Sequence, residues 1–195
     1  MKPGFIGAAV MIVTLFSAAC GSKKKEPKEK FIPVLSFIQS QVANVDTSLY
    51  SIRKIVYVDS LRSDTTYIPR EEFKKEAHDF LMMTDISLSE YADRYTETKN
   101  YDETINRVLI TYIPVDPSKE DIQRQEVLIK HNEVSGDKIS SIIINSVVNT
   151  KDSLVEKRML WQVDKSFQVT VTRQLARQPE TVSTYKLIWG EDEFQ

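Results

Sequence analysis

The feature that most constrains the fold is a succession of short β-type segments that fills the second half of the chain. Stretches rich in Val, Ile, Thr, Tyr and Trp alternate there with turn residues, a pattern typical of consecutive strands. Connections this short leave no room for crossover helices, so we expect an antiparallel meander. The six expected strands are 107–113 (RVLITYI), 124–130 (RQEVLIK), 139–148 (ISSIIINSVV), 154–163 (LVEKRMLWQV), 166–173 (SFQVTVTR) and 181–189 (TVSTYKLIW).

The preceding segments predict helices that would cover one face of this sheet. Apolar residues recur at helical spacing after Pro33 and again after Pro69, and a short third helix is expected over 88–95. Segments 53–59 and 65–68 between the first two helices favour a hairpin, and 96–103 is interpreted as a polar connector. The predicted fold class is α+β, with N-terminal helices packed on one face of a curved, mainly antiparallel sheet of about six strands. The other face is expected to be largely wet, because polar side chains alternate along the strands.

The first nineteen residues have the parts of a secretion signal. Lys2 is followed by an uncharged apolar run over 5–16, which is shorter than the roughly 20 residues that span a bilayer. The small residues 17–19 precede Cys20, the only cysteine of the chain. This arrangement resembles the lipobox of bacterial lipoproteins, although Ser17 stands where leucine is usual. The resemblance implies cleavage before Cys20, a diacylglycerol on its sulfur, and an N-acyl chain such as palmitate on the new N-terminus.

The domain organisation that follows is a signal peptide over 1–19, a lipidated cysteine and basic tether over 20–30, and one domain over 31–195. Residues 21–30 (GSKKKEPKEK) hold five Lys and two Glu, a net charge of +3. The other residues of the chain after 30 hold 20 Lys and Arg and 26 Asp and Glu, a net charge of −6. We therefore expect attachment to a membrane through the lipid on Cys20 and no binding to nucleic acid. The expected location is the cell envelope, at the outer membrane and facing the periplasm.

Residue types that carry common chemistry are sparse. Only Gly21, Gly136 and Gly190 follow the signal, so no phosphate-cradling loop or dinucleotide fingerprint can be written. His78 and His131 are far apart in sequence and lie in no metal-binding motif. We therefore predict no cofactor, no metal site and no catalytic residue, and the sequence leaves the ligand-binding residues unknown.

Three functions remain open at this level. The first is a non-catalytic envelope lipoprotein with a binding or structural role, whose partner is an envelope protein or a lipid. The second is a carrier of lipid or another small ligand, with a helix–sheet cavity lined by Val42, Phe80, Trp161 and Trp189. The third is a hydrolase that uses His131 with a serine and a carboxylate. The polar face of the last three strands is compatible with a protein-binding surface and with a plain solvated face.

Overall fold

A single antiparallel sheet of nine strands forms the body of the protein. The computed structural model describes residues 31–49, 51–59, 61–131 and 136–190. The strand order is β2-β1-β9-β8-β7-β6-β5-β4-β3, so seven consecutive strands form a meander and the first hairpin is added beside its last strand. The strands are β1 (Ile52–Tyr57), β2 (Ser63–Ile68), β3 (Tyr95–Asp102), β4 (Arg107–Pro114), β5 (Ile122–Lys130), β6 (Lys138–Asn149), β7 (Ser153–Gln162), β8 (Ser166–Leu175) and β9 (Thr181–Ile188).

The prediction of an α+β fold with a sheet of about six strands is therefore wrong, because the protein is mostly β with nine strands. The six expected strands correspond to β4–β9, and three more join them. Strand β1 pairs along β9 from Arg53↔Ile188 to Tyr57↔Thr184, which brings the whole β1–β2 hairpin into the sheet. Residues 96–103 were expected to be a connector, yet most of this segment belongs to β3, which pairs with β4 over its full length.

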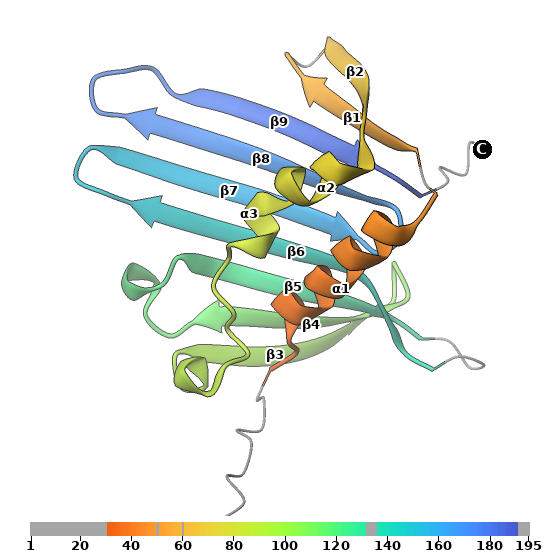
Figure 1. Ribbon diagram of the computed structural model, residues 1–195. Helices are drawn as coiled ribbons and strands as arrows, with labels where there is room; N and C mark the ends of the chain where they lie inside the picture. The colour runs from red at the N-terminus through yellow and green to blue at the C-terminus, as the bar shows by residue number, and fades with distance from the viewer. Residues whose placement is uncertain (1–30, 50, 60, 132–135, 191–195) are drawn as a thin grey trace, which may run out of the picture.

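Three helices lie in one layer on one face of the sheet (Figure 1): α1 (Val34–Thr47), α2 (Arg70–Glu76) and α3 (His78–Leu81). The expected second helix is thus two short ones, because Ala77 between them has a ψ of 7° and leaves the helical conformation. The expected third helix is only a 3-10 turn, Ser89–Tyr91, since the chain enters β3 at Tyr95.

The helix layer and the sheet meet in an aromatic core. Alternate residues of the central strands point to the helices, and those of β7 and β8 include Trp161 and Phe167, both fully buried. Their rings stack with centroids 5.3 Å apart. Phe73 of α2 and Phe80 of α3 contact these rings from the helix side. The core therefore depends on side chains from both layers, and losing the contact of either layer would expose large aromatic surface.

Helix α1 is bound to the sheet just before its first residue and again at its middle. At its start, the backbone N–H of Ile32 donates to the Tyr112 hydroxyl at 3.2 Å, and the Phe31 ring lies 4.9 Å from the Tyr112 ring. Further along, the Gln41 side-chain oxygen accepts from the backbone N–H of Asp164 in the β7–β8 turn at 3.1 Å. The chain thus enters the domain on the helix face, beside β4.

Candidate functional site

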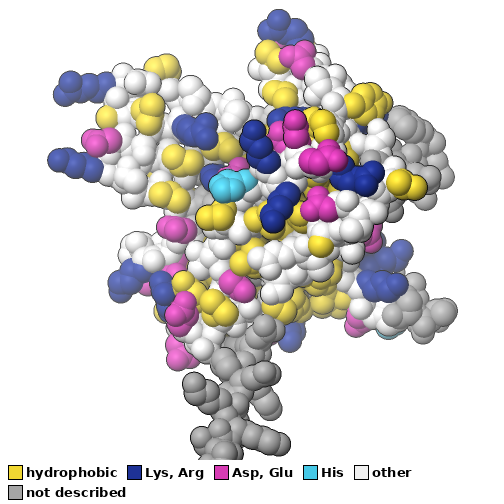
Figure 2. Space-filling model, viewed as in Figure 1, with side chains coloured by type: hydrophobic (Ala, Val, Ile, Leu, Met, Phe, Trp, Pro, Cys, Tyr) yellow, Lys and Arg dark blue, Asp and Glu magenta, His cyan; other side chains and the backbone are white. Residues whose placement is uncertain are grey.

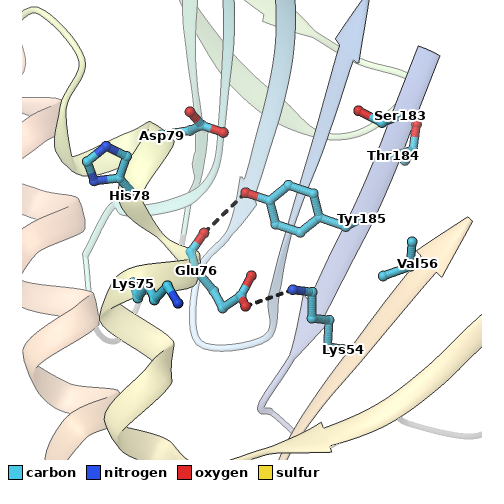
Figure 3. A pocket seen from close by; sticks show the side chains of 9 residues that line it. All are labelled: Lys54, Val56, Lys75, Glu76, His78, Asp79, Ser183, Thr184 and Tyr185. Atoms are coloured by element: carbon cyan, nitrogen blue, oxygen red, sulfur yellow. Dashed lines mark hydrogen bonds and ion pairs between the residues drawn. The ribbon is translucent and has the colours of Figure 1, made fainter. Parts of the chain in front are cut away.

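A pocket of about 330 Å³ lies where the α2–α3 junction meets β1 and β9 (Figure 3). The helices contribute Lys75, Glu76, His78 and Asp79, and the strands contribute Lys54, Val56, Ser183, Thr184 and Tyr185. This pocket gathers more titratable groups than the hollows described below, which makes it the candidate for a catalytic site.

Both carboxylates of this pocket are already neutralised. Glu76 accepts from the Lys54 ammonium at 2.7 Å, and Asp79 accepts from the Lys157 ammonium of β7 at 2.6 Å. All four side chains are less than one third exposed, so these ion pairs are screened less than surface pairs. The pairs connect the helix layer to strands β1 and β7, so both carboxylates serve as structural contacts between the two layers.

Tyr185 fills the floor of the same pocket. Its hydroxyl donates to the backbone carbonyl of Glu76 at 3.2 Å, which ties β9 to the end of α2. The Lys54 ammonium lies 5.6 Å from the centre of the Tyr185 ring. Burial raises the pKa of Tyr185, and the nearby Asp79 and Glu76 carboxylates raise it further. A phenol held in its neutral form at this position is a hydrogen-bond donor and a poor general base.

The pocket does not assemble a nucleophile with a base. His78 is exposed and lies on the opposite side of the pocket from Ser183 (Figure 3). Among the described residues, no hydrogen bond joins His78 to a serine or a carboxylate. Figure 2 shows basic and acidic side chains intermixed over α2 and α3, so this surface is neither uniformly positive nor uniformly negative. A charge-neutral cluster between two layers is the best description of this pocket.

The second histidine lies in a different region, at the end of β5. His131 Nδ1 is 2.6 Å from Asp137 Oδ1, so a carboxylate does orient this ring. Both side chains are about two thirds exposed, and no serine is hydrogen-bonded to His131 among the residues that the structure describes. The hydrolase hypothesis required His131 to lie in a cleft within hydrogen-bond reach of a serine or a carboxylate. The carboxylate is within reach, but the exposure of both side chains argues against a cleft.

The four residues expected to line a carrier cavity are instead packed into the core. Val42, Phe80, Trp161 and Trp189 are each 3% exposed or less. Trp161 lies 5.1 Å from Phe80 and 5.3 Å from Trp189, measured between ring centroids. Rings at these distances are in contact, so at this place the space between the helices and the sheet is filled by protein.

The uncovered face of the sheet has a different character, and we call it the open face: the side turned away from α1, α2 and α3. Direct cross-strand partners form a polar row across five neighbouring strands, namely Asn145, Arg158, Thr170, Thr184 and Tyr57. Strands are about 4.8 Å apart, so this row is roughly 19 Å long. Beside it runs a mixed row of Ile143, Leu160, Gln168, Lys186 and Ile55.

Two hollows lie along these rows and share one residue. One, of about 290 Å³, has Asn145, Arg158 and Thr170 in its lining, and the other, of about 600 Å³, has Tyr57 and Thr184. Gln168 lines both, so the hollows adjoin at this residue; we call the two together, over β6–β9 and β1, the open-face groove. A groove of this length suits an elongated ligand better than a compact one.

Several polar groups in and beside the open-face groove have no partner among the described residues. Arg158, in the lining of the groove, is exposed, and Lys186, in the mixed row beside it, is half-buried; neither forms an ion pair with any described residue. The Asn145 side-chain oxygen is inaccessible to solvent and accepts no hydrogen bond within the described chain. The hydroxyls of Thr170 and Thr184 lie 3.0 Å apart and satisfy each other only in part. Unlike the pocket at the α2–α3 junction, this groove leaves hydrogen-bonding capacity for a ligand.

Carboxylates near the groove do not neutralise its cations. Asp59, at the end that lies beyond β1, is bound to Arg62 at 2.6 Å, and the backbone N–H of Leu61 and the Arg62 side chain lower the pKa of Asp59. Glu126, farther along the sheet, is paired with Arg124. Each of these acids is thus satisfied by its own neighbour.

Other expectations are not settled by the described residues. Residues 1–19, Cys20 and the tether over 20–30 lie outside them. No helix in the described part of the chain is long and apolar enough to cross a membrane. Within residues 31–49, 51–59, 61–131 and 136–190, no group of three or more potential metal ligands comes together.

Comparison with known proteins adds no functional assignment. No protein-family model, curated protein or solved structure matches this chain.

The sequence did not predict the open-face groove as a site. The polar alternation of β8 and β9 pointed to a wet face, but the groove depends on which residues of five strands lie opposite each other. Strand register is a tertiary property. The sequence alone therefore does not predict that Asn145, Arg158 and Thr170 are cross-strand neighbours.

Proposed function

We propose that this protein is a lipid-anchored, non-catalytic binding protein of the bacterial cell envelope. The anchoring part rests on the resemblance of residues 17–20 to a lipobox, with Cys20 as the lipidated residue. An extended tether of ten residues reaches about 33 Å, so the domain would work close to the membrane surface. Replacing Cys20 with Ser should release the protein from the membrane fraction, and unchanged retention would contradict the anchor.

The binding part rests on one observation: no described helix covers the open face, and several of its polar side chains have no partner among the described residues. On the other face of the sheet, the helix layer is packed with its aromatic side chains in contact. The carboxylates of Glu76 and Asp79 there are each paired with a lysine. The open face instead offers a ligand the Arg158 guanidinium, which has no ion pair in the described chain, and the hydroxyls and amides of the groove lining. These groups favour binding on the open face over a ligand held between helices and sheet.

Photo-crosslinking in cells tests which face binds. A photoreactive amino acid is placed at Thr170 on the open face, and at Lys74 on the exposed side of α2 as the matched control. We expect crosslinked adducts from position 170 and few or none from position 74. Adducts that arise mainly from position 74, or from neither position, would contradict binding through the open face.

A further inference from the structure

We infer that the open-face groove binds an acidic saccharide, a chain of hydroxyl-rich rings that carries carboxylate or phosphate groups. The inference rests on the proposed function, because it names the ligand of the surface described there. Four features of the groove carry it: its length, its uncompensated cations, its hydroxyl and amide groups, and the strands in which it lies.

The charge of the ligand follows from the two cations. Arg158 of β7 and Lys186 of β9 are separated by one strand and offset by two residues in register, so their backbones are roughly 12 Å apart. Arg158 is exposed and Lys186 half-buried, and neither has a carboxylate partner in the described chain, although the domain carries a net negative charge overall. An anionic ligand would form charge-assisted hydrogen bonds with both, and the planar guanidinium of Arg158 suits an oxyanion with two acceptor atoms.

The polar lining indicates hydroxyl groups on the ligand. Between and beside the two cations, the side chains of Asn145, Gln168, Thr170 and Thr184 offer amides and hydroxyls, groups that both donate and accept. A carboxylate or a phosphate diester offers these groups acceptors alone, whereas a sugar hydroxyl both donates and accepts. Hydroxyl groups beside the negative charge would therefore pair with the amides and hydroxyls of the lining in both roles.

The apolar part of the lining fits the faces of sugar rings. Ile143 and Leu160 line one end of the groove, and the Tyr57 ring, 39% exposed, lines the other. Such surfaces pack against the C–H faces of pyranose rings while the neighbouring row contacts the hydroxyls. At roughly 19 Å, the polar row matches about four rings at a spacing of about 5 Å.

A peptide is the less suitable occupant of this position. Extended peptides bind to sheets mainly by adding a strand at an edge, where backbone groups are unpaired. The groove instead lies over β6–β9 and β1, each of which is paired on both sides. Recognition there must proceed through side chains, and the available side chains are those that recognise hydroxyls and anions.

Calorimetric titration of the full chain in detergent tests the inference with four defined tetramers. Tetragalacturonate carries carboxylates, phosphorylated mannotetraose carries phosphate, maltotetraose is neutral, and tetraglutamate is an acidic peptide. We expect one or both acidic saccharides to bind at least tenfold more tightly than maltotetraose and tetraglutamate, and to weaken as salt is raised. The stronger of the two acidic ligands identifies the anion as a carboxylate or a phosphate.

Variants locate the binding. Arg158→Gln and Lys186→Gln should each weaken the bound saccharide about tenfold, whereas Lys74→Gln on α2 should leave affinity unchanged. Equal affinity of the neutral and acidic saccharides, tighter binding of tetraglutamate, or no change in Arg158→Gln would overturn the inference. So would the absence of saccharide binding at millimolar concentration. If no saccharide binds but position 170 still forms crosslinks in cells, the open face binds another ligand. That result would overturn the saccharide inference and leave the proposed function standing.

Discussion

Phe73 is the side chain that most directly holds α2 against the sheet, and its removal tests whether the helix–sheet interface is filled. The ring is fully buried and contacts three other aromatic rings, with centroids at 4.9 Å from Trp189, 5.8 Å from Phe167 and 6.4 Å from Trp161. No other residue of α2 is buried. Replacing Phe73 with Ala would therefore leave a cavity lined by aromatic rings and weaken the contact of the whole helix.

The expected cost follows from these contacts. Truncation of a buried Phe to Ala lowers the free energy of unfolding by about 3–5 kcal/mol. For a domain of this size, 1 kcal/mol corresponds to a change in Tm of about 2–4 °C, so we expect Tm to fall by roughly 6–20 °C. Near-ultraviolet circular dichroism should weaken as well, because Trp161 and Trp189 lose a neighbouring ring that fixes their surroundings.

Thermal unfolding followed by far-ultraviolet circular dichroism gives Tm, with Lys74→Ala as the control. Lys74 is adjacent in sequence but exposed, so its truncation should change Tm by no more than about 2 °C. A Tm for the Phe73→Ala variant within 2 °C of the wild-type value would refute the reasoning. Such a result would mean that the space around Phe73 is loosely occupied, as a ligand-carrying cavity would require.

Three further predictions concern polar groups. Gln125 is 1% exposed and its side-chain nitrogen is unpaired within the described chain, so Gln125→Met should raise stability by about 1 kcal/mol in urea unfolding; a loss of stability would show that the amide has a partner. Glu76→Gln breaks the ion pair with Lys54 and should cost about 1 kcal/mol at low salt and less at 1 M NaCl, and an equal loss at both salt concentrations would contradict an electrostatic origin. Burial raises the pKa of Tyr112 from its usual 10 to about 12, so its contribution to stability is complete below pH 10 and is lost as pH rises through 12. Absorbance at 295 nm should show this phenolate forming together with unfolding, and titration of all tyrosines near pH 10 in the folded protein would contradict the prediction.

The parts of the fold that could be predicted are those where the local pattern and the tertiary environment agree. Strand β8 alternates Phe167, Val169 and Val171 with polar residues, and in the structure these three are buried against the helices. Strand β3 lacks such a pattern, because it is an edge strand and most of its residues are exposed. Strand β3 is extended because it pairs with β4, and this pairing leaves no recognisable pattern in the local sequence.

The limits of prediction at the site have the same origin. The break between α2 and α3 at Ala77 is marked by neither glycine nor proline, so periodicity alone extended one helix through it. The aromatic residues Trp161 and Trp189 were compatible with a core and with a cavity until their ring contacts were known. Arg158 and Lys186 gained significance only through their register and their lack of partners, which depend on the assembled sheet.

We propose attachment of the domain to a membrane through Cys20, and mass spectrometry of the natural polypeptide tests this proposal most directly. We expect a mature protein that begins at Cys20 and whose N-terminal peptide carries a diacylglycerol on sulfur, with or without a further acyl chain on the amine. An unmodified thiol at this position, or a polypeptide that begins downstream of it, would contradict the lipid anchor.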